Sequence, residues 1–151
     1  MTSKVAFLIE SNEYEFPPIS IELLNATQMP GGLFRLENAA YFAEGVAYHD
    51  VVEALPGAIA GQFVFVRVVK KSDFVPMSII LLESGVDDEV MALLRLHDCV
   101  IEYGEFSGYR MLAVAVPPHV AFEPLREQLL DLEEVARISV AELNRRVAHD
   151  A

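Results

Sequence analysis

Three adjacent His-Asp pairs are the residues of this sequence whose types could carry metal chemistry. They are His49-Asp50, His97-Asp98 and His149-Asp150. An imidazole and a carboxylate can bind one divalent ion, as they do in metal-dependent hydrolases. Such enzymes draw further ligands from successive helices, whereas the first pair here lies in strand-turn sequence and the third in a tail. A hydrolase that uses His49 and Asp50 is therefore our third hypothesis only, and we expect no metal or other cofactor.

Cys99 is the single cysteine and lies two residues after His97. Residues two apart in a strand face the same side, so a thiol and its base are conceivable neighbours. The run "CVIEY", however, is typical of a core strand, and unoxidised cysteine is among the most buried residue types. Glu102 and Glu105 are interpreted as a solvated face, and Gly-rich phosphate loops and serine-nucleophile motifs are absent. We therefore expect a protein that is not an enzyme.

The densest group of polar and aromatic residues is "GGLFRLENAAYFAEGVAYHDVVEALP", residues 31–56. Gly45 permits the positive φ of a tight bend, and the side chain of Asn38 can cap a turn. One interpretation is a strand connection pinned by aromatic residues. The other is a polar and aromatic rim at a binding surface, where Tyr is enriched. On this second interpretation the partner-binding residues are Glu37, Asn38, Tyr41, Glu44, His49 and Asp50.

The formal net charge is −12, from 23 acidic and 11 basic residues. Binding a phosphate backbone requires clustered Lys and Arg, and here only Lys70-Lys71 and Arg145-Arg146 are adjacent. We therefore expect neither nucleic acid nor an anionic membrane as a direct partner. A basic protein would be attracted, because summed charge raises association rates by roughly 10 to 1,000-fold. The alternative is that the acidity only keeps an apolar-rich chain in solution.

Composition indicates one domain of ordinary size, or two small subdomains that share a core. The chain has 151 residues, of which 53% are hydrophobic. No apolar run approaches the roughly 20 residues that a membrane-spanning helix needs. The N-terminus is poor material for a signal peptide, and a single cysteine suits a reducing compartment. These features predict a cytoplasmic protein.

Residues 1–72 are predicted to be a β-rich subdomain of short strands separated by turns. The run "ISIELLNAT" alternates Ile19, Ile21 and Leu23 against Ser20, Glu22 and Leu24. The run "LFRLE" alternates in the same way, with Phe34 and Leu36 on one side. Five such strands at close spacing predict a small curled sheet or barrel.

The sequence pattern of residues 73–151 is different, because it predicts helices as well as strands. "VPMSIILLE" is a buried strand by its continuous apolar run, and "SGVDDEVMALLRL" is a helix with acidic residues in its first turn. "CVIEYGEF" and "YRMLAVAVPP" form a hairpin around Ser-Gly, and "FEPLREQLLDLEEVA" is helical. The order strand-helix-strand-strand-helix predicts a ferredoxin-like subdomain, and the chain as a whole is predicted to be α+β.

The closing element of that unit, at residues 135–142, has two interpretations. "ARISVAEL" predicts a strand, because Ile138 and Val140 are β-branched. Apolar residues also continue the helical stripe at spacings of three and four, so one helix from about 121 to 147 is the alternative. We favour the strand.

Four blocks of the chain resemble successive blocks of a bacterial family of unknown function. They are "YEFPPISIELLNAT", "GGLFRLENAAYFAEGVAYHDVVEA", "FVRVVKKS" and "GYRMLAVAVPPHVAFEPLREQL". Members of that family carry a "YPP-(V/I)-S-x-E-x-L" opening and a "GLY-x-(I/L)-(D/E)-N-x-P-F-(F/Y)-A-x-G" block. This chain has Ala40 where proline is common and His49 where glycine is common. The resemblance implies a small cytoplasmic bacterial protein and a common fold, without an established activity.

Functional hypotheses of three classes remain. The leading one is a non-enzymatic acidic binding protein, most concretely an immunity-type or antitoxin-type partner that neutralises a basic toxin by direct binding. The second is a small-molecule sensor or regulatory module whose ferredoxin-like half binds a ligand or forms a homodimer. The third is the metal-dependent hydrolase.

Overall fold

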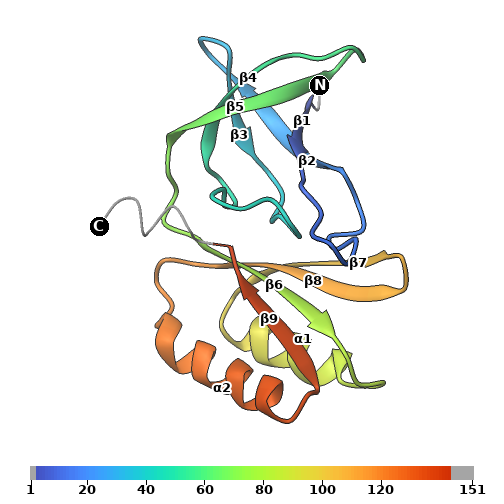
Figure 1. Cartoon of the computed structure of the whole chain (residues 1–151). Helices are drawn as coiled ribbons and strands as arrows, with labels where there is room; N and C mark the ends of the chain where they lie inside the picture. The colour runs from blue at the N-terminus through green and yellow to red at the C-terminus, as the bar shows by residue number, and fades with distance from the viewer. Residues whose placement is uncertain (1–2, 144–151) are drawn as a thin grey trace.

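In the computed structural model, residues 3–143 are described, and they form two lobes stacked end to end (Figure 1). The upper lobe is a closed barrel, and the lower lobe is a four-stranded antiparallel sheet in the order β7-β8-β6-β9. The barrel strands are β1 (Ser3–Leu8), β2 (Ile21–Met29), β3 (Leu33–Leu36), β4 (Val51–Pro56) and β5 (Gln62–Lys70). The lower lobe contains β6 (Val75–Leu81), α1 (Asp87–Leu96), β7 (Val100–Phe106), β8 (Tyr109–Val116), α2 (Phe122–Glu134) and β9 (Ile138–Glu142).

The predicted α+β class, with a ferredoxin-like unit over residues 73–151, is wrong, although the predicted order strand-helix-strand-strand-helix-strand does occur in residues 75–142. The protein is mostly β: strands make up 43% of the structure, in two sheets, and the two helices are short. The expectation gave too much weight to two amphipathic segments of 10 and 13 residues, which cover one face of one sheet only. Within the described residues, no helix is both long enough and apolar enough to cross a membrane.

The structure of residues 135–142 distinguishes between the strand and the helix that the sequence allows for the closing element. α2 ends at Glu134, Ala136 has a φ of 60°, and β9 pairs antiparallel with β6. The strand prediction is confirmed, because burying Ile138 against the sheet outweighs the helical stripe. The alternative helix is excluded as far as Leu143, and its last residues, 144–147, lie outside the described part of the chain.

The barrel core is built from alternate residues of its strands, as the pleat requires. Phe34 and Leu36 are buried on β3. On β2 the buried face carries Leu24 together with the acidic Glu22, whereas the side chain of Ile21 is 51% exposed and that of Leu23 41% exposed. The strand thus points a carboxylate inward and two aliphatic side chains outward, and this arrangement shapes the candidate site below.

The loop between β3 and β4, residues 37–50, packs against both lobes. Ala40, Ala43 and Val46 pack into the barrel core. Ala39 packs instead on Ala113 and neighbouring small residues of β8, on the sheet face that the helices do not cover. The same loop therefore closes one end of the barrel and rests on the lower sheet.

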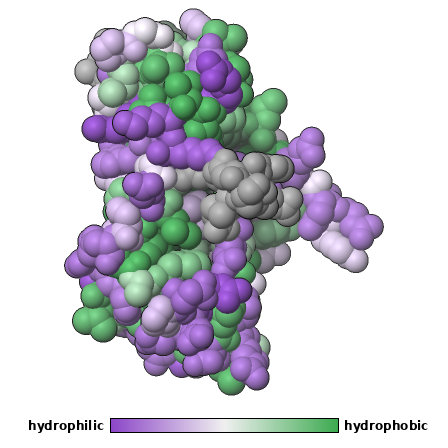
Figure 2. All heavy atoms as spheres, turned by 90° about the vertical axis from the view of Figure 1, so that its left-hand side faces the viewer, coloured by the Kyte–Doolittle hydropathy of each residue, from purple (hydrophilic) through white to green (hydrophobic). Residues whose placement is uncertain are grey.

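The surfaces of the two lobes differ in character on the face that Figure 2 shows. The larger patch of hydrophobic residues lies on the barrel, beside a band of hydrophilic ones, whereas the lower lobe carries more hydrophilic residues around smaller hydrophobic patches. The sequence agrees with this division, since 15 of the 23 acidic residues fall within residues 73–151.

Candidate functional site

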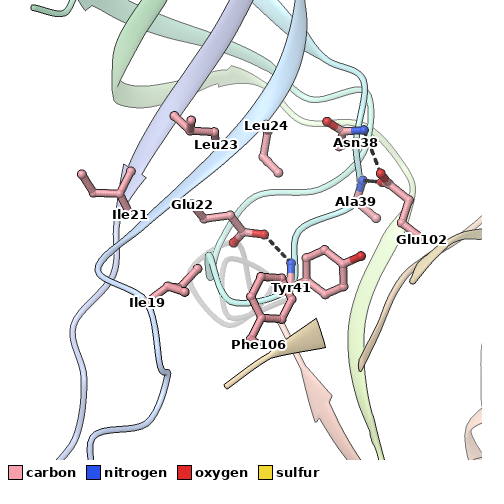
Figure 3. Close-up of a pocket in the computed structure, with 10 residues that line it drawn as sticks. All are labelled: Ile19, Ile21, Glu22, Leu23, Leu24, Asn38, Ala39, Tyr41, Glu102 and Phe106. Atoms are coloured by element: carbon pink, nitrogen blue, oxygen red, sulfur yellow. Dashed lines mark hydrogen bonds between the residues drawn. The ribbon is translucent and has the colours of Figure 1, made fainter. Parts of the chain in front are cut away.

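A cavity of about 260 Å³ lies where the barrel meets the lower sheet (Figure 3). One wall is the aliphatic outer side of β2, with Ile21 and Leu23. The opposite wall comes from loop 37–50 and from β7, including Tyr41 and Glu102. The cavity thus combines exposed aliphatic side chains with carboxylates.

Glu22 fixes the loop from the barrel side. Its Oε2 accepts a hydrogen bond from the backbone N–H of Tyr41 (2.6 Å), and its Oε1 accepts from Phe42 (3.0 Å) and Ala43 (2.9 Å). The side chain is buried, and burial raises the pKa of its carboxyl although the three backbone donors act in the opposite direction. A carboxylate held in this way positions the loop, because each donated bond satisfies a backbone N–H that water cannot easily reach.

Glu102, at the centre of β7, fixes the same loop from the sheet side. Its Oε2 accepts from the backbone N–H of Ala39 (2.8 Å), and its Oε1 accepts from Nδ2 of Asn38 (2.9 Å). Oδ1 of Asn38 in turn accepts from the backbone N–H of Asn25 on β2 (2.7 Å). This chain of bonds ties the barrel to the lower sheet through two side chains.

Tyr41 forms part of the cavity wall. Its ring contacts Phe106 edge-on, at 4.8 Å between centroids. A Cβ added at Gly104 would lie only 2.9 Å from the Tyr41 hydroxyl, so any side chain at this position would force a neighbouring ring to shift. Burial, together with the carboxylates of Glu102 and Glu22, raises the pKa of Tyr41 to about 12.

The pKa of Glu102 leads to a prediction about pH. Burial raises it above the ordinary value of 4.5, so the contribution of this group to stability is fully present below pH 4.5 and is lost as pH rises through the folded-state pKa. We therefore expect the stability advantage of the wild type over Glu102→Gln to shrink as pH rises from 4.5. Urea unfolding at several pH values measures this difference.

The exposed Glu127 on α2 provides the control, since Glu127→Gln should give a difference that changes little over the same pH range. An advantage of the wild type over Glu102→Gln that grows with pH would contradict the direction of the shift.

Two of the six sequence-predicted binding residues, Asn38 and Tyr41, line this cavity. Glu37 and His49 instead pair with each other, at 3.2 Å between Oε1 and Nε2, and Glu37 also accepts from Thr27 and Arg35. Burial raises the pKa of Glu37, but these two bonds and the charges of Arg35 and His49 together outweigh it and the pKa is lowered overall.

The remaining two predicted residues lie elsewhere. Asp50 is completely buried, and its carboxylate accepts from the backbone N–H groups of Ala47 (2.9 Å) and Ser72 (2.8 Å). Glu44 is exposed and lines a different cavity, beneath the loop. The six residues therefore do not form one surface, and several of them hold the strand connection together, as the first interpretation of this stretch expected.

Sequence reasoning missed Glu22 and Glu102, the two acidic residues that matter most here. The prediction of a solvated face is wrong for Glu102, which is partly buried, although Glu105 is exposed. The donors that hold Glu22 begin 19 residues away, and the backbone donor to Glu102 is 63 residues away. The one signal within the sequence was that Glu22 stands between apolar residues on a strand.

The positions of the histidine, aspartate and cysteine side chains bear on the metal hypothesis and on the thiol hypothesis. Within residues 3–143, no group of three or more His, Cys, Asp and Glu side chains is placed to hold a metal ion. His49 and Asp50 turn to different partners, and His149-Asp150 lies outside the described residues. Burial and the neighbouring Asp98 raise the pKa of Cys99 to about 11, which disfavours the nucleophilic thiolate.

Comparison with known proteins places the chain in a family. A family model described as a domain of unknown function, DUF4265, matches residues 22–140, so the chain belongs to this family. No match is found among curated proteins.

One solved structure is similar in fold. It is the crystal structure of a hypothetical protein from Neisseria gonorrhoeae, with a TM-score of 0.76 and 24% sequence identity. The likeness covers 95% of this chain and 94% of the other, so the two-lobed fold is shared over nearly the whole length.

Proposed function

We propose that this protein is a non-enzymatic binding protein that docks a basic protein partner onto the barrel and the cavity beside it. The observation that carries the proposal is an apolar row across the outside of the barrel. In strand register the row contains Leu55, Val64, Ala6 and Leu23. Leu8 and Ile21 form a second, adjacent pair.

This surface is aliphatic and largely exposed. Leu8, Leu55 and Val64 have 78%, 58% and 42% of their surface exposed, and Ala6 is half-buried. Large contiguous exposed apolar patches mark interaction sites on protein surfaces. On β2 the row ends at Leu23 and the second pair ends at Ile21, and both residues line the cavity with the two carboxylates.

A Lys or Arg side chain of the partner suits the cavity. Its aliphatic stem would contact Ile21 and Leu23, and its charged head would lie near Glu102. Such a residue is a common anchor of an interface when it fills a desolvated pocket. The net charge of −12 supports the approach of a basic partner over distances beyond contact.

An immunity-type or antitoxin-type role is the most specific form of this proposal. A cytoplasmic protein that covers the cationic site of a basic toxin needs strong acidity and an apolar contact patch, and it needs no catalytic residues. The sensor and hydrolase hypotheses lack a comparable observation at this cavity.

The test begins with native co-purification from the source cells, followed by identification of the partner and measurement of its affinity in pure form. We expect Leu23→Lys, in the cavity wall, to weaken binding about tenfold or more, because it places a charge in the interface centre. Leu96→Lys changes the net charge equally but lies at the end of α1, where the side chain is 78% exposed. It should leave the affinity within about twofold.

Salt dependence gives a second measurement on the same complex. The affinity should fall as salt rises from about 50 to about 500 mM, since screening weakens the attraction of an acidic protein for a basic one. An affinity that is independent of salt, or that both lysine variants reduce equally, would refute the proposal.

A further inference from the structure

A second cavity lies on the other side of Tyr41, beneath loop 37–50. Its volume is about 390 Å³, within the range of small-molecule sites. The uncovered face of the lower sheet forms its floor, and the segment before β2 forms its roof. Apolar lining residues include Phe16, Phe42, Ile80, Met111 and Leu143.

Ser78, on the central strand β6, gives this cavity an unused polar group. Its neighbours Met77 and Ile79 belong to the core beneath the helices, so the alternation of the strand turns Ser78 to the cavity side. The residue is only 3% exposed, and within residues 3–143 its Oγ has no hydrogen-bond partner. A buried hydroxyl without a partner is costly, and such groups are rare unless something absent from the chain satisfies them.

From the apolar walls and the unpartnered Ser78 hydroxyl, we infer that this cavity binds a small, uncharged, largely apolar molecule whose single polar group bonds to Oγ of Ser78. The aromatic walls favour a ring, because the edge-to-face pair of Phe16 and Phe42 leaves ring surface available for contact. The lining residues include one charged residue, the exposed Glu44, and none of them is Lys, Arg or His. An anionic ligand would therefore be buried without a counter-charge, which is strongly unfavourable.

Indole is a suitable probe, since it is a neutral ring with one N–H donor. The protein would be labelled with 13C at its methionine methyl groups and titrated with indole up to about 10 mM, a range suited to ligands of this size. We expect the Met111 methyl resonance to shift and saturate. The Met77 methyl, buried on the opposite face of the same sheet, should stay in place, and the anion indole-3-carboxylate should bind at least about tenfold more weakly.

Two variants test the role of the Ser78 hydroxyl and of the open volume of the cavity. Ser78→Ala should raise the dissociation constant for indole about fivefold, the effect of one neutral hydrogen bond. The urea midpoint of this variant should stay equal or rise, because a buried unpaired group is removed. Ala141→Phe adds a ring from β9 at an exposed position of the cavity and should abolish the Met111 response.

Ser84→Ala, at an exposed turn, is the matched control and should bind indole as the wild type does. The inference is overturned if Met111 does not respond, if Met77 and Met29 respond equally, or if Ser78→Ala binds indole unchanged. These results do not depend on a protein partner, so they separate this site from the docking surface on the barrel.

Discussion

Replacing Asp50 with alanine is expected to lower the free energy of unfolding by about 3–5 kcal/mol, because one buried and one partly buried backbone donor lose a charged acceptor. Those donors are the N–H groups of Ala47 and Ser72, which lie on either side of β4 and β5. The carboxylate is completely buried, so water cannot replace it without a rearrangement of the loop. Urea unfolding monitored by circular dichroism measures the loss.

Two further variants define the cause of that loss. Asp50→Asn keeps one acceptor oxygen and should cost about half as much. Asp131→Ala, on the exposed side of α2, should change stability by less than about 0.5 kcal/mol. A cost below about 1 kcal/mol for Asp50→Ala would contradict the structural role assigned to this carboxylate.

Glu22→Ala is expected to cost about 2–4 kcal/mol, because three backbone donors lose their acceptor at once. The expected loss is smaller than that for Asp50. Burial raises the pKa of Glu22, so its charged form already costs desolvation, and the adjacent cavity gives water a route to the freed donors. The change is measured by urea unfolding.

Amide hydrogen exchange shows whether the effect is local to the loop. In Glu22→Ala, exchange should accelerate at Tyr41, Phe42 and Ala43, while the amides of β6 and β8 keep their relative protection. Glu127→Ala, at an exposed helical position, should alter neither stability nor exchange of the loop. Unchanged protection of the three amides would show that Glu22 does not hold them.

The elements of this fold were largely predictable from local pattern. Alternation identified the barrel strands, Ser107-Gly108 marked the hairpin of β7 and β8, and β-branched residues marked β9. The class was not predictable in the same way, since two short amphipathic segments gave helices an importance that the structure does not bear out. Local periodicity reports which element forms and not how much of the core it supplies.

The candidate site was harder to predict because its polar groups are paired across long distances in the chain. Asn38 and Tyr41 were found from their setting in a turn rich in aromatic residues. Glu22 and Glu102 were missed, because a buried carboxylate is unfavourable until a distant loop supplies its donors. Asp50 was selected for binding when it is a structural acceptor, since an acidic residue beside histidine looks the same in either role.

The loop of residues 37–50 also has a consequence for the order of events on the ribosome. Chains emerge N-terminal end first, so the strands of the barrel leave the exit tunnel before the lower sheet exists. The acceptor for Ala39 is Glu102, 63 residues later. Until that segment appears, the aromatic residues of the loop that face the lower sheet in the folded protein are exposed to water. Chaperone binding would therefore be most useful during this interval.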